Sequence, residues 1–236
     1  MIVQNTQVDS ILPVLKENKS KNIIFVVNTA LGYENWVKAV GEERLMIGFP
    51  SAGGERQGNV ISYFIGSKLQ RCFQTTTFGE YDGKKSERVK KIIKLFNNAG
   101  IPSVFCNNMD AWQKTHVALI TCIGNALYGY NCNNYKFSKN YNSVKEMVIA
   151  IKEGRKVIKA NNIALTPKKL WWFNLPTHVL TAMFSLFMNT KLAETTMAKH
   201  CSVAKEEMIN LQKEFDILIK QSKLTTPMIE KLKKNL

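Results

Sequence analysis

The sequence lacks several features that would assign it to a class at once. It has no run of roughly 18 or more apolar residues, so we expect no membrane-spanning helix. The start shows no charged segment followed by an apolar one, so we expect no signal peptide and a cytoplasmic location. The five cysteines form no CxxC pair, which argues against a zinc site or a disulfide framework and favours free thiols.

The charge balance is strongly basic, with 33 Lys and Arg against 18 Asp and Glu and a net charge of +15. The lysines are spread along the chain with glutamates between them, as on solvated helix faces. No basic platform with interleaved aromatics and no helix-turn-helix signature appears. Nucleic-acid binding is therefore the least favoured alternative, and a site for a small anionic molecule fits the charge equally well.

The first half of the sequence alternates between strand and helix patterns. The run NIIFVVN is typical of a buried parallel strand, because it is continuous, apolar and rich in β-branched residues. The opening MIVQ resembles the tail of a strand and predicts an open sheet edge. The segment SAGGERQG follows a strand without opening a clear helix, so it is a weak phosphate loop, and no GxGxxG is present. Strands are predicted over 22–28, 44–49, 59–66, 74–80 and 101–106, with helices over 6–20, 32–41 and 85–100.

After about residue 108 every segment has a helical pattern. Thr166 and Thr226 each precede a proline at a predicted first helical position. The predicted helices span 110–128, 143–161, 167–173, 176–188, 191–222 and 226–234. The sequence thus predicts an α/β portion over 1–107 followed by an all-α portion over 108–236.

Five segments in order carry a resemblance to a known family. They are NIIFVVNTALG, ERLMIGFPSAGG, TTFGEYDG, DAWQKTHVAL and AKEEMINLQKEFD. In this order and spacing they resemble ketopantoate reductase (2-dehydropantoate 2-reductase) and its relatives. The resemblance implies an incomplete Rossmann-like parallel sheet, lacking the N-terminal part of the nucleotide-binding domain. A helical C-terminal domain of the 6-phosphogluconate dehydrogenase-like type would follow.

The resemblance also implies a reaction, that of pantothenate biosynthesis, in which NADPH delivers a hydride to the C2 ketone of a 2-oxo acid. The lysine of the family's W-x-K motif matches Lys114, which would stabilise the developing alkoxide and then donate a proton. Helical spacing puts Lys114, Ala118, Cys122 and Asn125 on a face of small residues that could border a cleft. The alternative is an exposed lysine, which is the usual state of a lysine.

Three further residues match family positions. Glu214, in QKEFD, would hold the substrate hydroxyl and orient the lysine, and Ser202 would bind the substrate carboxylate. Twelve residues span about 18 Å of unbroken helix, so both reach one small substrate only if the helix breaks or bends. Asn28 ends its strand at the carboxyl edge of the sheet, near the expected nicotinamide and substrate. The alternatives are a solvated glutamate and a turn asparagine.

The sequence departs from the family at two positions. Typical members carry asparagines four and eight residues after the lysine, where this chain has Ala118 and Cys122. These departures leave the substrate open, and a larger or less polar 2-oxo acid is one hypothesis. Asn134, or its neighbour Asn133, is a candidate substitute contact. We expect the nearby histidines His116 and His200 to be structural.

Two readings of the whole chain remain. In the first it is an NADPH-dependent reductase of a ketopantoate-like 2-oxo acid, impaired because the phosphate-binding turn is missing, so we expect weak NADPH binding. In the second it is a non-catalytic remnant, or a subunit of a split reductase, that serves in assembly. A homodimer, or a complementing chain that supplies sheet strands, is the expected protein partner. NADP rather than NAD rests on the resemblance alone.

Overall fold

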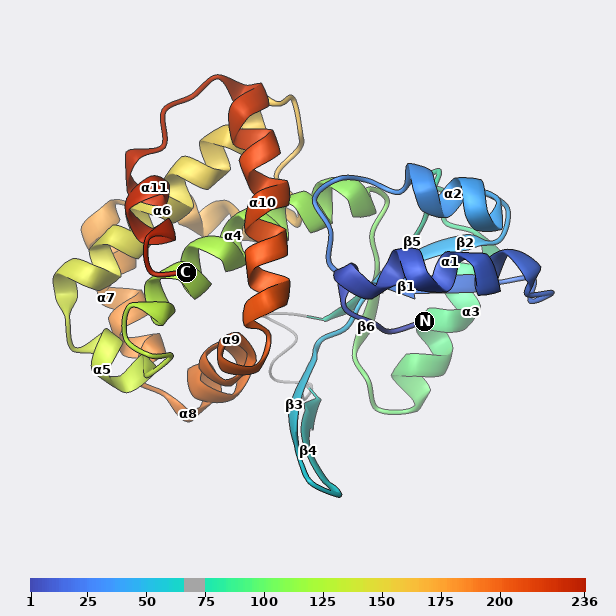
Figure 1. Ribbon diagram of the computed structural model, residues 1–236, viewed down its shortest axis with the longest axis horizontal. Coiled ribbons are helices and arrows are strands. Elements are labelled where there is room, and N and C mark those ends of the chain that lie inside the picture. The colour runs from blue at the N-terminus through green and yellow to red at the C-terminus, as the bar shows by residue number, and fades with distance from the viewer. Residues whose placement is uncertain (66–74) are drawn as a thin grey trace. The chain divides into compact units, whose positions relative to one another are not determined.

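The computed structural model describes residues 1–65 and 75–236, and Figure 1 labels the elements. The chain divides into two compact units, one of residues 1–52 and 63–113 and the other of residues 53–62 and 114–236. The first contains α1 (Val8–Glu17), β1 (Ile23–Val26), α2 (Glu34–Val40), β2 (Leu45–Phe49), β5 (Thr76–Glu80), α3 (Glu87–Asn98) and β6 (Ser103–Phe105). The helix α4 (Met109–Tyr128) begins in the first unit and continues into the second.

The main sheet has the strand order β1-β2-β5-β6. β1 and β2 are parallel, as are β5 and β6, but β2 and β5 are antiparallel, so the sheet is mixed rather than wholly parallel. The N-terminal segment adds to the β1 edge, where Ile2 forms a parallel bridge with Val26. The terminal amino group also donates to the Ile24 carbonyl at 2.8 Å. The strand-like character predicted for MIVQ is therefore confirmed.

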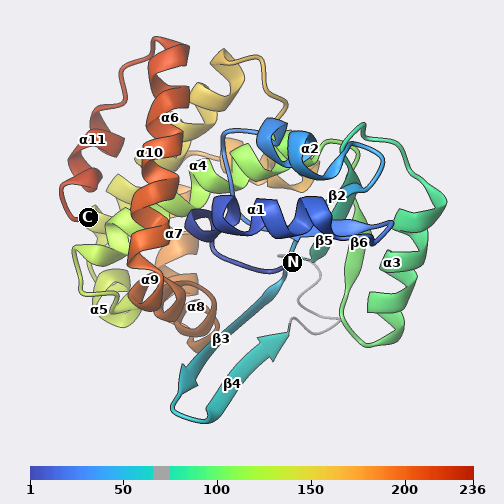
Figure 2. The same ribbon diagram turned by 45° about the vertical axis from the view of Figure 1, so that its right-hand side comes forward.

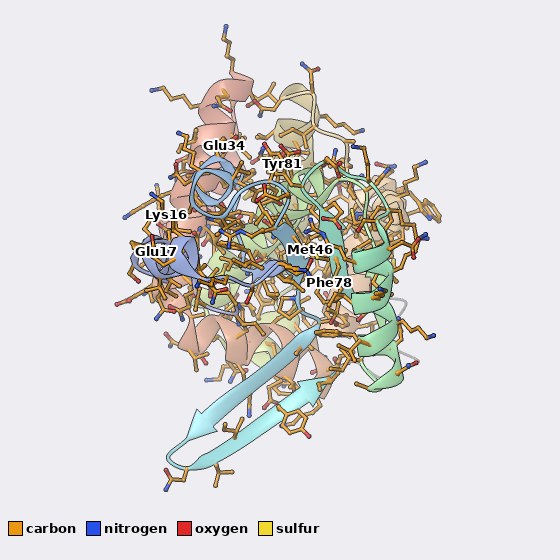
Figure 3. All side chains as sticks on the ribbon, turned by 90° about the vertical axis from the view of Figure 1, so that its right-hand side faces the viewer. Lys16, Glu17, Glu34, Met46, Phe78 and Tyr81 are labelled. Carbon is orange, nitrogen blue, oxygen red and sulfur yellow. The ribbon has the colours of Figure 1, made fainter. Side chains whose placement is uncertain are left out.

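The two faces of this sheet bury different residues, because successive side chains of a strand point to opposite sides. Phe25 and Ile47, paired in register, pack under α1 and α2 with Trp36. Met46 and Phe78 face the other way and pack under α3, as Figure 3 shows. Both strands of the β1–β2 pair are thus covered on both faces, which explains their continuous apolar sequences.

The predicted strands 22–28, 44–49, 74–80 and 101–106 correspond to β1, β2, β5 and β6. The glycine-rich segment, a weak candidate for a phosphate loop, is part of a strand. SAGGERQG does not form a phosphate loop, because its residues enter the strand β3 (Ala52–Gln57). β3 pairs with β4 (Val60–Ile65) in a two-stranded sheet of its own, visible as a ribbon in Figures 1 and 2. The predicted connection 67–73, with Cys72, lies outside the described residues.

The second unit is helical and is built around α4. Its other elements are α5 (Asn134–Ser138), α6 (Tyr141–Ala160), η3 (Lys168–Asn174), α7 (Thr177–Met188), α8 (Lys191–Ala193), the π-helical turn η4 (Glu194–Ala198), α9 (Lys199–Val203), α10 (Lys205–Ser222) and α11 (Pro227–Lys233). α4 packs closely against α6 at Ala118 of α4 and Gly154 of α6. Any side chain at Gly154 would begin only 3.1 Å from the Ala118 carbonyl oxygen. α4 touches α10 through the Asn125 side chain, which donates to Gln212 at 2.8 Å.

The single helix predicted over 191–222 is wrong in detail. The chain forms α8, a π-helical turn and α9, and it leaves helical geometry at Ala204, with φ −114° and ψ 32°. α10 then begins at Lys205. Nothing in the local sequence marks this break, because alanine favours a helix. In the part of the chain that the structure describes, no helix is long and apolar enough to cross a membrane.

Candidate active site

The start of α4 is tied to the end of β1 by a buried glutamine. Gln113 is 1% exposed, and its Nε2 donates to the carbonyl oxygen of Val27 at 2.8 Å. Its Oε1 accepts from the Tyr33 hydroxyl at 3.2 Å. Burial raises the pKa of Tyr33 well above its usual range, so this hydroxyl keeps its proton and remains a donor.

This hydrogen bond joins the neighbours of two predicted site residues. Asn28 follows Val27 in the loop after β1, and Lys114 follows Gln113 in α4. Lys114 is half-buried, so it does not have the exposed position that its alternative interpretation predicted. Asn28 is also half-buried, and its place in the loop after β1 agrees with the alternative of a turn asparagine as well as with a site residue. The carboxyl end of β1 and the first turns of α4 are therefore held in a fixed spacing by a buried contact inside the first unit.

The expectation that Ala118, Cys122 and Asn125 border a cleft is wrong. All three are buried in the interior of the helical unit. The Ala118 backbone and side chain face Gly154 of α6, and Asn125 bonds Gln212 of α10. Burial raises the pKa of the Cys122 thiol far above its usual range, so it remains protonated. These residues are small because helices pack closely against α4 here.

Glu214 is a buried carboxylate on α10, only 6% exposed, and its Oε1 accepts from Asn210 Nδ2 at 3.3 Å. Glu207 is buried to the same degree and lies seven residues earlier, which puts both carboxylates on one face of α10. Sequence reasoning missed Glu207, because KEEM at a helix start resembles a solvated first turn. Buried carboxylates are uncommon without a partner or a role.

Ser202 lies in α9, and its hydroxyl donates to the Lys199 carbonyl oxygen at 2.8 Å. Its side chain is exposed, whereas that of Glu214 is buried. The break at Ala204 separates these residues onto two helices, so the distance for one unbroken helix does not apply. The length of an unbroken helix therefore no longer argues against one small ligand that contacts both Ser202 and Glu214.

Asn134 has a structural role. It is buried at the start of α5, and its Nδ2 donates to the Met188 carbonyl oxygen at 2.7 Å. A second contact joins the same nitrogen to the carbonyl oxygen of Thr190 at 3.3 Å. These contacts satisfy carbonyl groups at the C-terminus of α7, so the proposed site does not include Asn134.

The two histidines near the motifs differ in environment. Burial, and then the nearby His200, lower the pKa of His116 to about 3, so its ring is neutral at physiological pH. His200 is exposed in α9. A neutral His116 cannot supply a proton as an imidazolium. Within the described ranges, no group of three or more His, Cys, Asp or Glu residues could hold a metal ion.

The described residues do not fit the pyrophosphate of a dinucleotide. The helix after β1 is α2, which has seven residues, carries Glu34 in its first turn and has no side-chain cap. A carboxylate there neutralises the partial positive charge at the start of the helix and would repel a phosphate. Gly53 and Gly54, from the predicted glycine-rich segment, lie in β3. Asn28 follows β1 at the carboxyl edge of the sheet, where ligands of open α/β folds bind.

This chain is similar to known proteins in its structure and not detectably in its sequence. No protein-family model matches the sequence, and comparison with curated proteins finds no match. A solved 2-dehydropantoate 2-reductase from Geobacter metallireducens GS-15 matches with a TM-score of 0.75 and 12% identity, over 99% of this chain and 74% of that one. This is the ketopantoate reductase fold.

Two other solved structures share this ketopantoate reductase fold. D-mandelate dehydrogenase with NADH matches with a TM-score of 0.72 and 14% identity, over 99% of this chain and 75% of that one. A dimeric ketopantoate reductase from Staphylococcus aureus matches with a TM-score of 0.67 and 13% identity, over 99% and 73%. The predicted fold class, a Rossmann-like portion followed by a helical domain, is confirmed. Identities this low establish the fold and leave the chemistry to be argued from the site.

Proposed function

We propose that this chain handles the substrate and the proton in a nicotinamide-dependent reduction of a ketopantoate-like 2-oxo acid. The observation that carries the proposal is the buried bond between Gln113 and Val27, which fixes the first turns of α4 against the end of β1. Ligands of open α/β folds bind at the carboxyl ends of strands, and that is where Asn28 lies. The reductase fold supports the same assignment.

The proposed step adds a hydride to C2 of the 2-oxo acid and a proton to its oxygen, which gives the 2-hydroxy acid. A nicotinamide cofactor, NADPH in the family that the sequence resembles, supplies the hydride when it is bound. The ammonium of Lys114 stabilises the negative charge that develops on the oxygen and then donates its proton there. We assign the contact with the substrate hydroxyl to a buried carboxylate of α10, Glu214 or Glu207.

From the family resemblance we also assign Asn28 a role beside the nicotinamide and the substrate, and Ser202 a role at the substrate carboxylate. Because the described residues offer no turn for the pyrophosphate, we expect this chain alone to bind NADPH weakly and to turn over slowly. A test of the proposal therefore has to measure substrate binding as well as activity.

The test is isothermal titration of ketopantoate into the wild-type chain and into Lys114→Met. We expect the substitution to weaken binding at least about tenfold, or 1.4 kcal/mol, because it removes a cation from the oxygen it would contact. Lys213→Met is the matched control, since Lys213 is exposed on α10 and should leave the affinity unchanged. Equal affinity of Lys114→Met and the wild type would rule out Lys114 as the contact, provided both unfold at the same temperature.

A further inference from the structure

The positive charge of this chain is concentrated in its helical part. Residues 114–236 carry 19 Lys and Arg against 8 Asp and Glu, whereas residues 1–113 carry 14 against 10. Most of the eight acids are already occupied. Two are buried and four pair with a lysine, namely Glu207 and Glu214 in the first case, and Glu146, Glu194, Asp216 and Glu230 in the second. Lysines outside these pairs therefore meet few acidic side chains at the surface.

The fold brings together two segments of this part that lack acids. Residues 154–193 and 217–229 contain no Asp or Glu. The end of α6 lies beside the last turn of α10, where Asn161 Nδ2 donates to the Leu218 carbonyl oxygen at 2.9 Å. Figures 1 and 2 both show the C-terminal ends of these two helices side by side. Cations from both segments are thus neighbours without a carboxylate from either segment between them.

η3 also contacts α6 in this region. Arg155 of α6 donates to the Leu170 carbonyl oxygen at 3.0 Å and to Asn174 Oδ1 at 2.9 Å. The last turns of α6 and α10 and the start of η3 therefore present their side chains in one neighbourhood. Six exposed lysines from these elements form what we call the basic surface: Lys156, Lys159, Lys168, Lys169, Lys220 and Lys223.

Helix dipoles account for only part of the basic surface. Lys159 and Lys220 lie in the last turns of their helices, where the partial negative charge favours a cation. Lys168 and Lys169 instead open η3, at the end of a helix where a cation is disfavoured. An anionic partner explains their position better than the stability of η3 does.

An exposed tryptophan adjoins these lysines. Trp171, two residues after Lys169, is 66% exposed. The next two aromatic residues pack within the unit, since Trp172 stacks on the buried Phe173 with ring centroids 4.0 Å apart. Packing explains Trp172 and Phe173, but it leaves the Trp171 indole in water, which costs free energy unless a partner covers it.

We propose that the basic surface and Trp171 bind single-stranded nucleic acid. Lysines attract phosphates as point charges and an exposed aromatic ring stacks on a base, which is how proteins hold single strands without reading their sequence. An acidic protein partner would favour arginine, whose planar group matches a carboxylate in pairs of hydrogen bonds. An anionic membrane would need a broad apolar face to enter the headgroup layer, and η3 offers one exposed indole.

The binding should be weak and strongly salt-dependent. Each phosphate held by a lysine contributes about −0.7 to the slope of log K against log salt for a single strand, so about five contacts give roughly −3 to −4. We expect a dissociation constant on the order of 10 µM at about 0.1 M salt. The sequence alone predicts no such platform, because its lysines come from three separate segments.

Fluorescence anisotropy of a fluorescein-labelled oligouridine of about 20 nucleotides, titrated with the full chain at roughly 50 to 200 mM NaCl, tests the proposal. We expect saturable binding, and a dissociation constant raised at least about tenfold when Lys168→Glu and Lys169→Glu are combined. Trp171→Ala should raise it at least about fivefold, because stacking is lost. The matched control combines Lys91→Glu and Lys94→Glu on α3, which changes the net charge equally and should raise it less than about twofold.

Three outcomes would overturn the proposal. The first is no saturable binding below about 100 µM chain, and binding to phosphatidylserine vesicles instead would assign the surface to an anionic lipid layer. The second is an equal loss in the two charge-reversed pairs, which would mean that net charge alone attracts the strand. The third is an unchanged affinity in Trp171→Ala, which would remove the stacking contact.

The variants should keep the wild-type unfolding temperature, because every side chain that they change is exposed. Lys220→Glu combined with Lys223→Glu is a second variant of the basic surface, on α10 instead of η3. It should weaken binding as the first pair does. A loss in the η3 pair alone, with a lower unfolding temperature, would count against the proposal, because it would trace the effect to η3 unfolding.

Discussion

Residues 115–135 and 170–190 are two segments of equal length, and neither contains an Asp, Glu, Lys or Arg. The first forms most of α4, which is enclosed by α6 and α10 and whose polar groups bond inside the unit. The second contains α7, which packs on one side and exposes an apolar stripe on the other. The same lack of charge therefore accompanies two environments. An enclosed helix has no solvent for charges to face, whereas α7 leaves part of its apolar surface uncovered within the chain.

The largest expected difference between these helices appears when the same residue is truncated in each. Leu127→Ala, in α4, removes a fully buried side chain and should lower the free energy of unfolding by about 2–5 kcal/mol. Leu186→Ala, in α7, should change it by less than about 0.5 kcal/mol, because this side chain is mostly exposed. Chemical denaturation measures both. A comparable loss in the two variants would mean that the outer face of α7 is already covered within one chain.

A smaller effect concerns the contact that fixes α4 to the sheet. Gln113→Leu keeps the size of the side chain but leaves the Val27 carbonyl and the Tyr33 hydroxyl without this partner, at a cost of up to about 3 kcal/mol. It should also weaken ketopantoate binding, because the end of β1 is then no longer tied to the start of α4. Tyr33→Phe breaks only one of the two bonds and is the milder control. An unchanged affinity in a folded Gln113→Leu chain would remove this contact from the account of the site.

The smallest effect separates a structural residue from a site residue. Asn134→Ala removes the amide that bonds the end of α7, so the free energy of unfolding should fall by about 1 kcal/mol. Its affinity for ketopantoate, measured by the same titration as for Lys114→Met, should stay that of the wild type. A loss of affinity without a loss of stability would return Asn134 to the site and show that its structural contacts are incidental.

Much of this fold could be predicted from periodicity and end signals. Helix α4 was expected over 110–128 and spans Met109–Tyr128, and α11 begins at Pro227, as the Thr226-Pro227 pair predicted. The strands of the main sheet followed from apolar runs that have helices on both faces. These signals are local, since they depend on which side of an element is buried and on the chemistry of its ends.

The features that the sequence did not reveal depend on contacts between distant segments. The direction of β5 against β2 and the pairing of β3 with β4 are properties of chain topology. The break at Ala204 has no breaker residue. The Gln113 contact joins residues 86 positions apart, and a glutamine between Trp112 and Lys114 carries no local sign of burial. For the same reason the row of small residues on α4 predicts a cleft wall, whereas the structure shows that Ala118 and Cys122 are buried against other helices.

The central claim is that a 2-oxo acid binds where the end of β1 meets the start of α4. Amide chemical-shift mapping of the deuterated, ¹⁵N-labelled chain during a ketopantoate titration tests it most directly. We expect saturable shifts concentrated at Asn28 and its loop and around Lys114, and their loss in Lys114→Met. Shifts confined to other regions, or none at millimolar ketopantoate, would contradict it and leave this chain with the ketopantoate reductase fold but without the substrate site.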